Sequence, residues 1–175
     1  SSRYTRRGQE KYKRIAAYIK QTVMQKKGNY LAFFPSYRML QDVMACTGPQ
    51  LDTSIRCICQ TSGMTEEERE AFLHEFEQKR KEDEGLLGFC VMGGIFGEGI
   101  DLKEDSLIGA IIVGTGIPQI CREREILKQY YDGRNEDGFA YAYRYPGMNK
   151  VLQSAGRVIR TAQDRGVVLL LDERF

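Results

Sequence analysis

Four residues near the C-terminal end have the types and spacing to bind a phosphate chain. Residues 153–160 read Q-S-A-G-R-V-I-R, a Q-x-x-G-R-x-x-R pattern formed by Gln153, Gly156, Arg157 and Arg160. On a helix, positions three or four residues apart share one face. Two arginines one turn apart repel each other unless they share an anion, and a guanidinium donates two parallel hydrogen bonds to phosphate. The pattern therefore favours a phosphate-binding helix face over the alternative, a solvated surface helix.

A glycine-rich segment follows one of the apolar runs. Residues 93–102 read G-G-I-F-G-E-G-I-D-L, and their glycines are Gly93, Gly94, Gly97 and Gly99. Such a loop can expose backbone amides to an anion, for instance a nucleic-acid phosphate. Glu98 and Asp101 are acidic and should not face a phosphate directly. A tight glycine turn with a purely structural role is the alternative.

Two more segments follow apolar runs and are candidate binding loops. Ser36 and Tyr37 come after the run Y-L-A-F-F-P. Ser36 can cap a helix, and at a helix start it could also donate to a phosphate, although a cap needs no ligand. Residues 114–119, G-T-G-I-P-Q, include Gly116 and form the second loop.

A cluster of aromatic residues has two interpretations. Phe139, Tyr141, Tyr143 and Tyr145 alternate with other residues and flank Arg144. Aromatic side chains of this kind stack on the bases of single strands. The same alternation is typical of a half-buried strand or a packed connection. We favour packing.

Helical and strand patterns alternate along the chain. Continuous apolar runs predict buried strands at residues 30–34, 54–60, 86–92, 107–113 and 167–171. Helical spacing or capping signals predict helices at residues 9–27, 36–46, 121–131 and 147–160, and after Thr65, which forms a capping box with Glu68. Continuous apolar strands separated by helices predict an α/β fold with a mostly parallel sheet covered on both faces. Ligands of such sheets bind outside the carboxyl ends of the strands.

Composition restricts the class of protein further. The chain has 175 residues with 26 basic and 24 acidic side chains, a net charge of +2, so global charge does not indicate a nucleic-acid partner. An odd count of five cysteines and the lack of a signal peptide favour reduced thiols in the cytoplasm. Cys57, Cys59 and Cys90 lie in apolar runs and are interpreted as small buried hydrophobes, so no metal site is expected. No apolar run has the length of a membrane span, so no membrane partner is expected.

Three segments together resemble a known family. Residues 153–160 resemble motif VI of superfamily 2 helicases in the form used by the XPD and DinG-like branch. Residues 93–102, with E-G-I-D at Glu98–Asp101, resemble motif V of that branch, and residues 30–37, Y-L-A-F-F-P-S-Y, resemble its motif IV. The resemblance covers nearly the whole chain and is closest to bacterial DinG-like helicases. It implies a RecA-like three-layer fold for residues 1–175, acting as the second motor domain of an ATP-dependent DNA helicase, with 5′ to 3′ polarity.

The resemblance also implies roles for particular residues. Arg157 and Arg160 would act as catalytic arginine fingers on ATP. The nucleotide contacts would be Gln153, Gly156, Arg157, Arg160, Glu98, Gly99 and Asp101. The contacts to single-stranded DNA would be Ser36, Tyr37, Gly94, Gly97 and Gly116. DNA repair in the bacterial cytoplasm is the implied setting.

Other parts of such an ATP site are absent from this sequence. No G-x-x-x-x-G-K-[ST] pattern and no D-E-A-H-like acidic pair occurs in the 175 residues. The resemblance places these groups, most of the Mg²⁺ coordination and any iron–sulfur cluster in a first RecA-like domain of the same polypeptide, which would be the partner of this one. The start at Ser-Ser and the stop directly after an apolar run also make us expect a fragment of a larger protein. We therefore expect the isolated domain to be inactive. A non-catalytic nucleic-acid-binding module with the same fold is the alternative, and a flavodoxin-like small-molecule domain is a weaker one.

Overall fold

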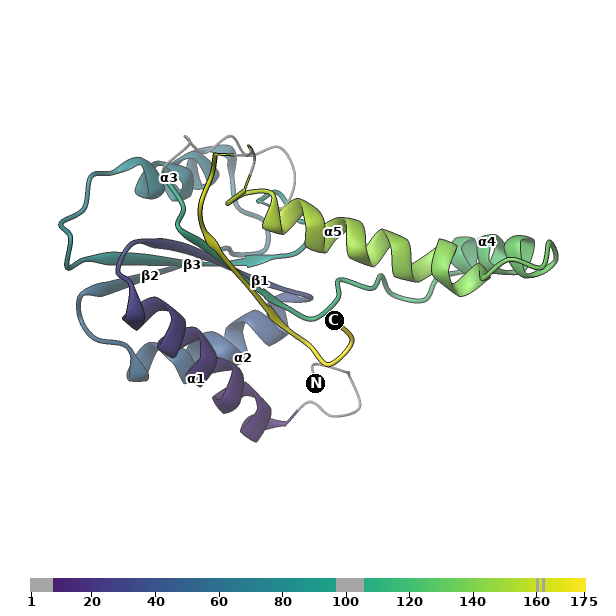
Figure 1. Ribbon diagram of the computed structural model, residues 1–175, viewed down its shortest axis with the longest axis horizontal. Helices are drawn as coiled ribbons and strands as arrows, with labels where there is room; N and C mark the ends of the chain where they lie inside the picture. Colours follow the sequence, from purple (N-terminus) through teal and green to yellow (C-terminus); the bar gives the residue numbers. More distant parts are fainter. Residues whose placement is uncertain (1–7, 97–105, 160, 162) are drawn as a thin grey trace.

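The sheet contains five parallel strands with helices on both faces. The computed structural model describes residues 8–96, 106–159, 161 and 163–175 (Figure 1). Its strands are β1 (Asn29–Phe34), β2 (Ile55–Cys59), β3 (Gly85–Val91), β4 (Gly109–Val113) and β5 (Val167–Leu171). Their order in the sheet is β2-β3-β1-β4-β5, and every pairing is parallel. The predicted α/β fold is confirmed, and each predicted strand is found.

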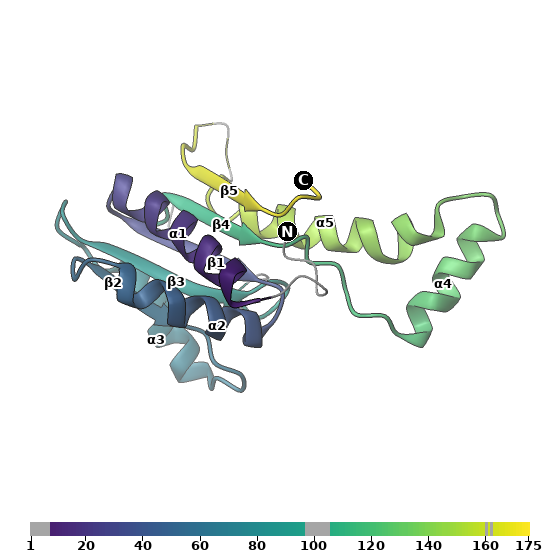
Figure 2. The same cartoon turned by 90° about the horizontal axis from the view of Figure 1, so that it is seen from below.

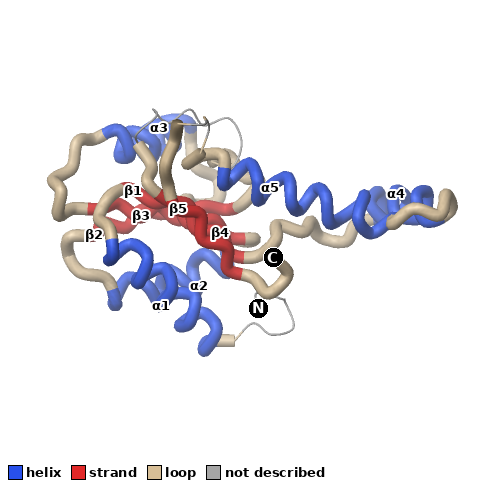
Figure 3. The backbone as a smooth tube through the Cα atoms, in the orientation of Figure 1, coloured by secondary structure: helices blue, strands red, loops and turns tan. Residues whose placement is uncertain are grey.

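Four helices cover the sheet as the apolar patterns require. They are α1 (Gln9–Gln25) and α2 (Tyr37–Thr47) on one face, with α3 (Glu66–Glu77) and α5 (Tyr145–Ala155) on the other (Figure 3). Ile19 of α1 and Leu40 of α2 belong to one buried cluster, which also contains Ala32. Phe72 of α3 and Val151 of α5 belong to the cluster on the opposite face. A short 3-10 helix, η2 (Gly48–Gln50), follows α2.

Both predicted helix caps are present. The Ser36 hydroxyl accepts a hydrogen bond from the Met39 amide at 3.3 Å. At the start of α3, the Thr65 hydroxyl accepts from the Glu68 amide at 3.2 Å, and the Glu68 carboxylate accepts from the Thr65 amide at 2.9 Å. These reciprocal bonds satisfy amide groups that a helix start leaves without helical partners.

An arm of helical segments extends away from the sheet (Figure 2). It consists of α4 (Arg122–Asp132), the π-helical turn η3 (Ala140–Arg144) and the first part of α5. No residue of α4 is buried. The aromatic residues from Phe139 to Tyr145 lie on this helical segment, so the half-buried strand considered for them is wrong. Their contacts explain the alternation: Tyr141 stacks on Tyr131 with ring centroids 4.0 Å apart, and Tyr143 is buried.

A membrane span requires a helix of sufficient length and apolar character. Among the residues that the structure describes, no helix combines the length and the apolar character needed to cross a bilayer.

Candidate functional site

Two predicted DNA contacts meet at the carboxyl edge of the sheet. Tyr37 follows β1, Gly94 follows β3, and the side chain of Gln60, which follows β2, lies between them. The Gln60 amide nitrogen donates to the Tyr37 hydroxyl at 2.9 Å, and its oxygen accepts from the Val91 amide at 2.9 Å. A Cβ placed on Gly94 would lie 3.3 Å from the Gln60 amide nitrogen. Gln60 is only 2% exposed, so it fixes these loops from beneath.

A lysine of α5 lies over the first glycine of the motif V segment. Gly93 has φ +65°, a left-handed conformation that favours glycine. A Cβ at this position would meet the Lys150 side chain at 2.8 Å from its Cε atom and 3.2 Å from its ammonium nitrogen. Lys150 therefore brings a positive charge to the edge where Tyr37 and Gly94 meet.

The loop after β4 is packed under α5. Gly116 is buried, with φ +62°, and a Cβ there would lie 3.1 Å from the Gly147 carbonyl oxygen. Gly147 has no space for a side chain either, because a Cβ on it would lie 2.7 Å from the Thr115 carbonyl oxygen. Gly116 therefore serves close packing of two backbones, and its role as a DNA contact stays a prediction. The exposed part of this segment begins at Gln119.

The arginine motif lies on a helix end and the turn that follows it. The predicted helix at 147–160 ends at Ala155, and Gly156 is its C-cap, with its amide donating to the carbonyl oxygens of Leu152 and Ser154. The expectation that all four motif residues share one helix face is wrong for this reason. Gln153 is exposed on the last turn, whereas Arg157 is half-buried in the turn beyond it.

This end of α5 lies toward the amino ends of the strands, whereas Tyr37 and Gly94 lie at the carboxyl ends. Val158, the residue after Arg157, is buried against Gly166, which directly precedes β5. Gly166 is also close to the Ile108 carbonyl, which directly precedes β4. The arginine turn therefore lies near the amino ends of β4 and β5, although the rule for parallel sheets directed attention to carboxyl ends.

Several predicted contacts lie outside the described residues. They are Gly97, Glu98, Gly99, Asp101 and Arg160. On the described side of the motif V segment, Phe96 is fully buried and its ring centroid is 4.3 Å from that of Phe72 in α3. The aromatic residue within this glycine-rich motif thus anchors the segment to the core.

Two residues of the site were not predicted from the sequence. Gln60 was interpreted only as the end of an apolar run, yet a polar residue at that point is a candidate for a buried hydrogen-bonding role. Lys150 gave no signal, since a lysine on a helix is ordinarily a solvated residue. Their contacts come from the packing of β2 and α5 against the same loops.

The cysteines are free thiols among the described residues. Cys90 is buried as expected, whereas Cys57 and Cys59, which were also interpreted as buried, are only half-buried. Burial raises the pKa of the Cys90 thiol well above its usual value, with a smaller contribution from Cys59. Within the described ranges, no three His, Cys, Asp or Glu side chains are arranged to hold a metal ion.

The donor set at the end of α5 fits one part of a nucleotide. The exposed Gln153 amide and the Arg157 guanidinium donate hydrogen bonds, which suits phosphate oxygens. Both lie within a single turn of the C-cap of α5. Because both groups are donors, they suit the phosphate oxygens of a nucleotide, whereas a Mg²⁺ ion requires oxygen ligands.

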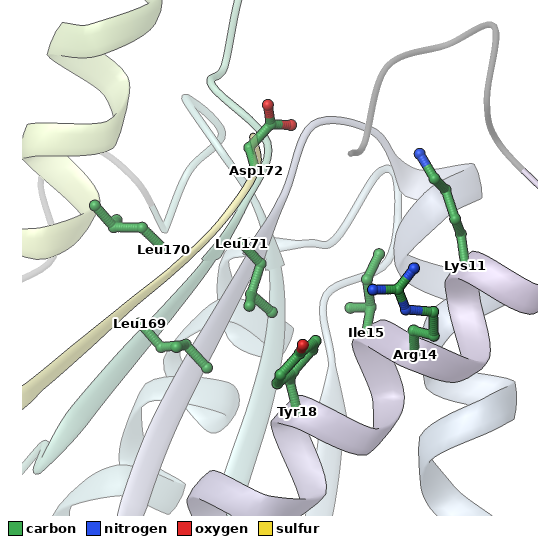
Figure 4. A pocket seen from close by; sticks show the side chains of 8 residues that line it. All are labelled: Lys11, Arg14, Ile15, Tyr18, Leu169, Leu170, Leu171 and Asp172. Carbon is green, nitrogen blue, oxygen red and sulfur yellow. The ribbon is translucent and has the colours of Figure 1, made fainter. Parts of the chain in front are cut away.

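A groove on the other face of the sheet holds none of the predicted contacts. It has a volume of about 400 Å³ and lies between α1 and β5 (Figure 4). Figure 4 shows Leu169 and Leu171 pointing toward α1, with Tyr18 opposite them and Lys11 and Arg14 farther along the helix. Because none of its lining residues is a predicted contact, this groove is a suitable reference surface for binding experiments.

Known proteins match the chain in sequence and in structure. The model of the helicase C-terminal domain family matches residues 19–175. A regulator of telomere elongation helicase 1 homolog from Drosophila yakuba is 30% identical over 155 residues, which are 83% of this chain and 16% of that protein. The homolog from Drosophila virilis is 29% identical over 154 residues, 83% of this chain and 15% of that protein. The chain thus spans less than a fifth of the length of these relatives.

Solved helicase structures match over the whole chain. An XPD helicase structure superposes with a TM-score of 0.78 at 26% identity, covering 100% of this chain and 30% of that one. An apo XPD structure gives 0.75 at 26% identity and covers 100% and 34% of the two chains. Domain 2 of the DEAD-box helicase Mss116p, at 13% identity and a TM-score of 0.57 over 94% of this chain and 51% of that one, shares the fold alone.

The two Drosophila homologs are eukaryotic proteins, so they lend no support to a bacterial source. The five-stranded parallel sheet, the order of the three motifs and these matches lead to one conclusion: the chain belongs to the helicase C-terminal domain family, in the XPD/DinG-like branch of superfamily 2.

Proposed function

We propose that this chain is the second motor domain of an ATP-dependent DNA helicase and supplies arginine fingers to an ATP site shared with a first RecA-like domain. The observation that carries the proposal is the position of Arg157. It follows the C-cap of α5 directly, in the sequence Q-x-x-G-R-x-x-R, on a domain of the helicase C-terminal family. A turn after a capped helix presents a side chain in a fixed direction, which is what a group that contacts a phosphate from another domain requires.

The nucleotide-binding side of the proposal includes residues on both motifs. We assign contacts with the terminal phosphates of ATP to Gln153, Gly156, Arg157 and Arg160, and contacts on the side of the partner domain to Glu98, Gly99 and Asp101. ATP brings Mg²⁺, which the first domain holds for the most part. The two guanidinium groups stabilise the charge that develops on the transferred phosphoryl group.

The DNA-binding side uses the opposite edge of the sheet. Ser36, Tyr37 and Gly94 lie along the backbone of a single strand, with the loop around Gly116 beside them. Gly97, which lies outside the described residues, is a further proposed contact to the strand. Lys150 supports this assignment, because its ammonium group lies against Gly93 and can neutralise a phosphate. Gly116 acts here through the position it gives its loop, since it is buried itself.

Helix α5 links the two sides. Lys150 and the last helical residue, Ala155, are five positions apart, which is about 8 Å along a helix axis. Gly147 and Val151 pack this helix tightly on the sheet. A rigid element that carries a DNA-side cation and a nucleotide-side arginine can couple domain closure on ATP to movement along the strand, in the 5′ to 3′ direction that the family resemblance implies.

The test uses the complete protein that contains this chain. In Arg157→Ala and Arg160→Ala variants, DNA-stimulated ATP turnover should fall on the order of a thousandfold, while ATP affinity changes far less. Arg122→Ala, at an exposed position of α4, is the control and should keep its turnover. Unchanged turnover in either finger variant rejects the finger role of that arginine. Unwinding of duplexes with a 5′ or a 3′ single-stranded tail decides the polarity.

A non-catalytic nucleic-acid-binding module is the second candidate. The observation that favours it is the absence of a phosphate-binding G-x-x-x-x-G-K-[ST] loop from this sequence. The complete reading frame distinguishes the two: such a loop before Ser1 supports the motor, and its absence supports the module. Under the motor proposal, the 175-residue chain alone hydrolyses no ATP above background.

A further inference from the structure

A cavity lies where the arm joins the sheet. It has a volume of about 410 Å³, within the range of small-ligand sites. Its walls come from the loop after β4, from the arm and from the segment after β5. The lining residues are Thr115, Ile117, Phe139, Arg144, Met148 and Arg174. Because Thr115 and Ile117 follow a parallel strand, the cavity is on the same edge of the sheet as Tyr37 and Gly94.

A buried hydroxyl in the wall of the cavity lacks a protein partner. Thr115 is 6% exposed, and its Oγ1 atom has no hydrogen-bond partner among the described residues. Buried hydroxyls are nearly always hydrogen-bonded, because an unsatisfied one is costly. A hydroxyl that lines a cavity of this size can be satisfied by a ligand with a donor or an acceptor at its edge.

One aromatic ring of the arm lines this cavity. Tyr143 is buried and donates its hydroxyl to Glu125 at 2.6 Å, and Tyr141 stacks on Tyr131. Phe139 differs because it lines the cavity. The residue is 42% exposed, and its ring packs on that of Tyr143 with centroids 5.3 Å apart. An exposed ring held in place by a second ring is a preorganised stacking surface.

The charges at the cavity are those of two arginines. The Arg144 guanidinium is 5.9 Å from the centroid of the Phe139 ring and 3.4 Å from the Asp137 carboxylate, and more than half of its side chain is exposed. Arg174 is oriented by hydrogen bonds to Asp172 at 2.6 and 2.8 Å. None of the six described lining residues is acidic. A ligand with a negative group next to a flat ring matches this combination.

We propose that this cavity binds one nucleotide of a single DNA strand. The base lies against Phe139, with Ile117 and Met148 as apolar walls, and an edge atom of the base forms a hydrogen bond with the Thr115 hydroxyl. The Arg144 guanidinium contacts the adjoining phosphate. This inference rests on the proposed function, and it names a base-binding position beside the backbone contacts at the Tyr37 and Gly94 edge.

The first experiment maps the site in the complete protein. An oligothymidylate with a single 5-iodouracil is crosslinked by ultraviolet light, and the attached residues are identified by mass spectrometry. The expected attachment is at Phe139 or in the segment from Thr115 to Ile117. An excess of free thymidine monophosphate should not suppress the crosslink, whereas excess unlabelled oligothymidylate should. Suppression by the mononucleotide would show a free-nucleotide site and overturn the strand as the ligand.

The second experiment measures affinity for oligothymidylate with substitutions that preserve the fold. Phe139→Leu keeps an apolar contact to Tyr143 but removes the aromatic face, and it should weaken binding about tenfold. Thr115→Val keeps the side-chain shape and removes only the hydroxyl, so binding should weaken about fivefold. Its melting temperature should stay equal or rise, because the lost hydroxyl has no partner in the described part of the chain.

The matched control is Tyr18→Leu. Tyr18 is 47% exposed and lines the groove of about 400 Å³ on the α1 side (Figure 4), so the change is of the same kind in a hollow of similar size. Its affinity for the strand should equal that of the wild type. Crosslinks in that groove, or equal losses for Tyr18→Leu and Phe139→Leu, would overturn the cavity assignment.

The outcomes also separate this inference from the proposed function. If Phe139→Leu and Thr115→Val bind like the wild type while ATP turnover still depends on DNA and on Arg157, the cavity assignment is wrong and the motor role remains. If the complete protein binds no single-stranded DNA, the proposed function fails, and the inference with it. A Thr115→Val variant with a lowered melting temperature and normal affinity would mark the hydroxyl as structural and overturn its role in binding.

Discussion

Gly147 of α5 lies directly against the backbone of Thr115, so that a Cβ on Gly147 would be 2.7 Å from the Thr115 carbonyl oxygen. This contact places the start of α5 on the loop after β4 and thereby forms one wall of the cavity between the arm and the sheet. Both partners are backbone atoms, so neither can move aside without shifting a helix or a loop.

Gly147→Ala should therefore destabilise the domain. We expect a loss of about 2 kcal/mol from overpacking, and hence a melting temperature lower by roughly 4–8 °C. Gly133→Ala is the control, because Gly133 has φ −66° and a Cβ there would meet its nearest neighbour at an ordinary 3.4 Å. Thermal unfolding of both variants checks the prediction, and equal stability of the two would contradict the tight contact.

Gln60→Ala should also destabilise the domain and loosen the DNA-side edge. It removes the acceptor of the Val91 amide and the donor to the Tyr37 hydroxyl. Leaving the half-buried Val91 amide without its acceptor costs about 1–2 kcal/mol. Gln41→Ala, at an exposed position of α2, should change stability by less than about 0.5 kcal/mol. Chemical denaturation measures both, and amide exchange at Val91 should accelerate only in the Gln60 variant.

Arg157→Lys should reveal whether geometry or charge matters at the end of α5. Lysine keeps the positive charge but cannot form two parallel bonds with one phosphate, so turnover in the complete protein should remain within about tenfold of that of Arg157→Ala. The double variant with Arg160→Ala should be hardly worse than the worse single one, since groups acting as a unit are not additive. Steady-state ATP hydrolysis with saturating DNA tests both statements. Near-normal turnover with lysine would point to a purely electrostatic role.

The pair of Tyr143 and Glu125 should give the arm a pH-dependent contribution to stability. The hydrogen bond to Glu125 raises the pKa of Tyr143 from 10 to about 12. Because the pKa is higher in the folded state, the contribution is fully present below pH 10 and is lost as the pH rises through about 12. Wild type should thus exceed Tyr143→Phe in melting temperature at pH 9, and the difference should narrow toward pH 12. A difference that stays constant over this range would rule out the titration. Tyr145→Phe, at an exposed position, is the control.

The sequence by itself determined the class of fold and the family. The apolar runs are continuous because both faces of a parallel sheet are covered, and each predicted strand is present. Local signals such as the cap at Ser36 and the capping box at Thr65 were also sufficient, because their partners are within three residues along the chain. The order of the three motifs identified the family for the same reason, since a motif is read from neighbouring residues.

Only the tertiary structure decided how the site is arranged. Gly156 ends α5, so Arg157 lies in a turn, near the amino ends of β4 and β5, and away from Tyr37 and Gly94. The buried Gln60, the lysine over Gly93 and the burial of Gly116 under α5 all depend on which elements pack together. The same holds for the aromatic residues from Phe139 to Tyr145. Their alternation in the sequence does not show that Tyr143 is buried while Phe139 lines a cavity. The physical reason is shared: local propensity is set by residues a few positions apart, whereas exposure and hydrogen-bond partners are set by contacts between segments far apart in the sequence.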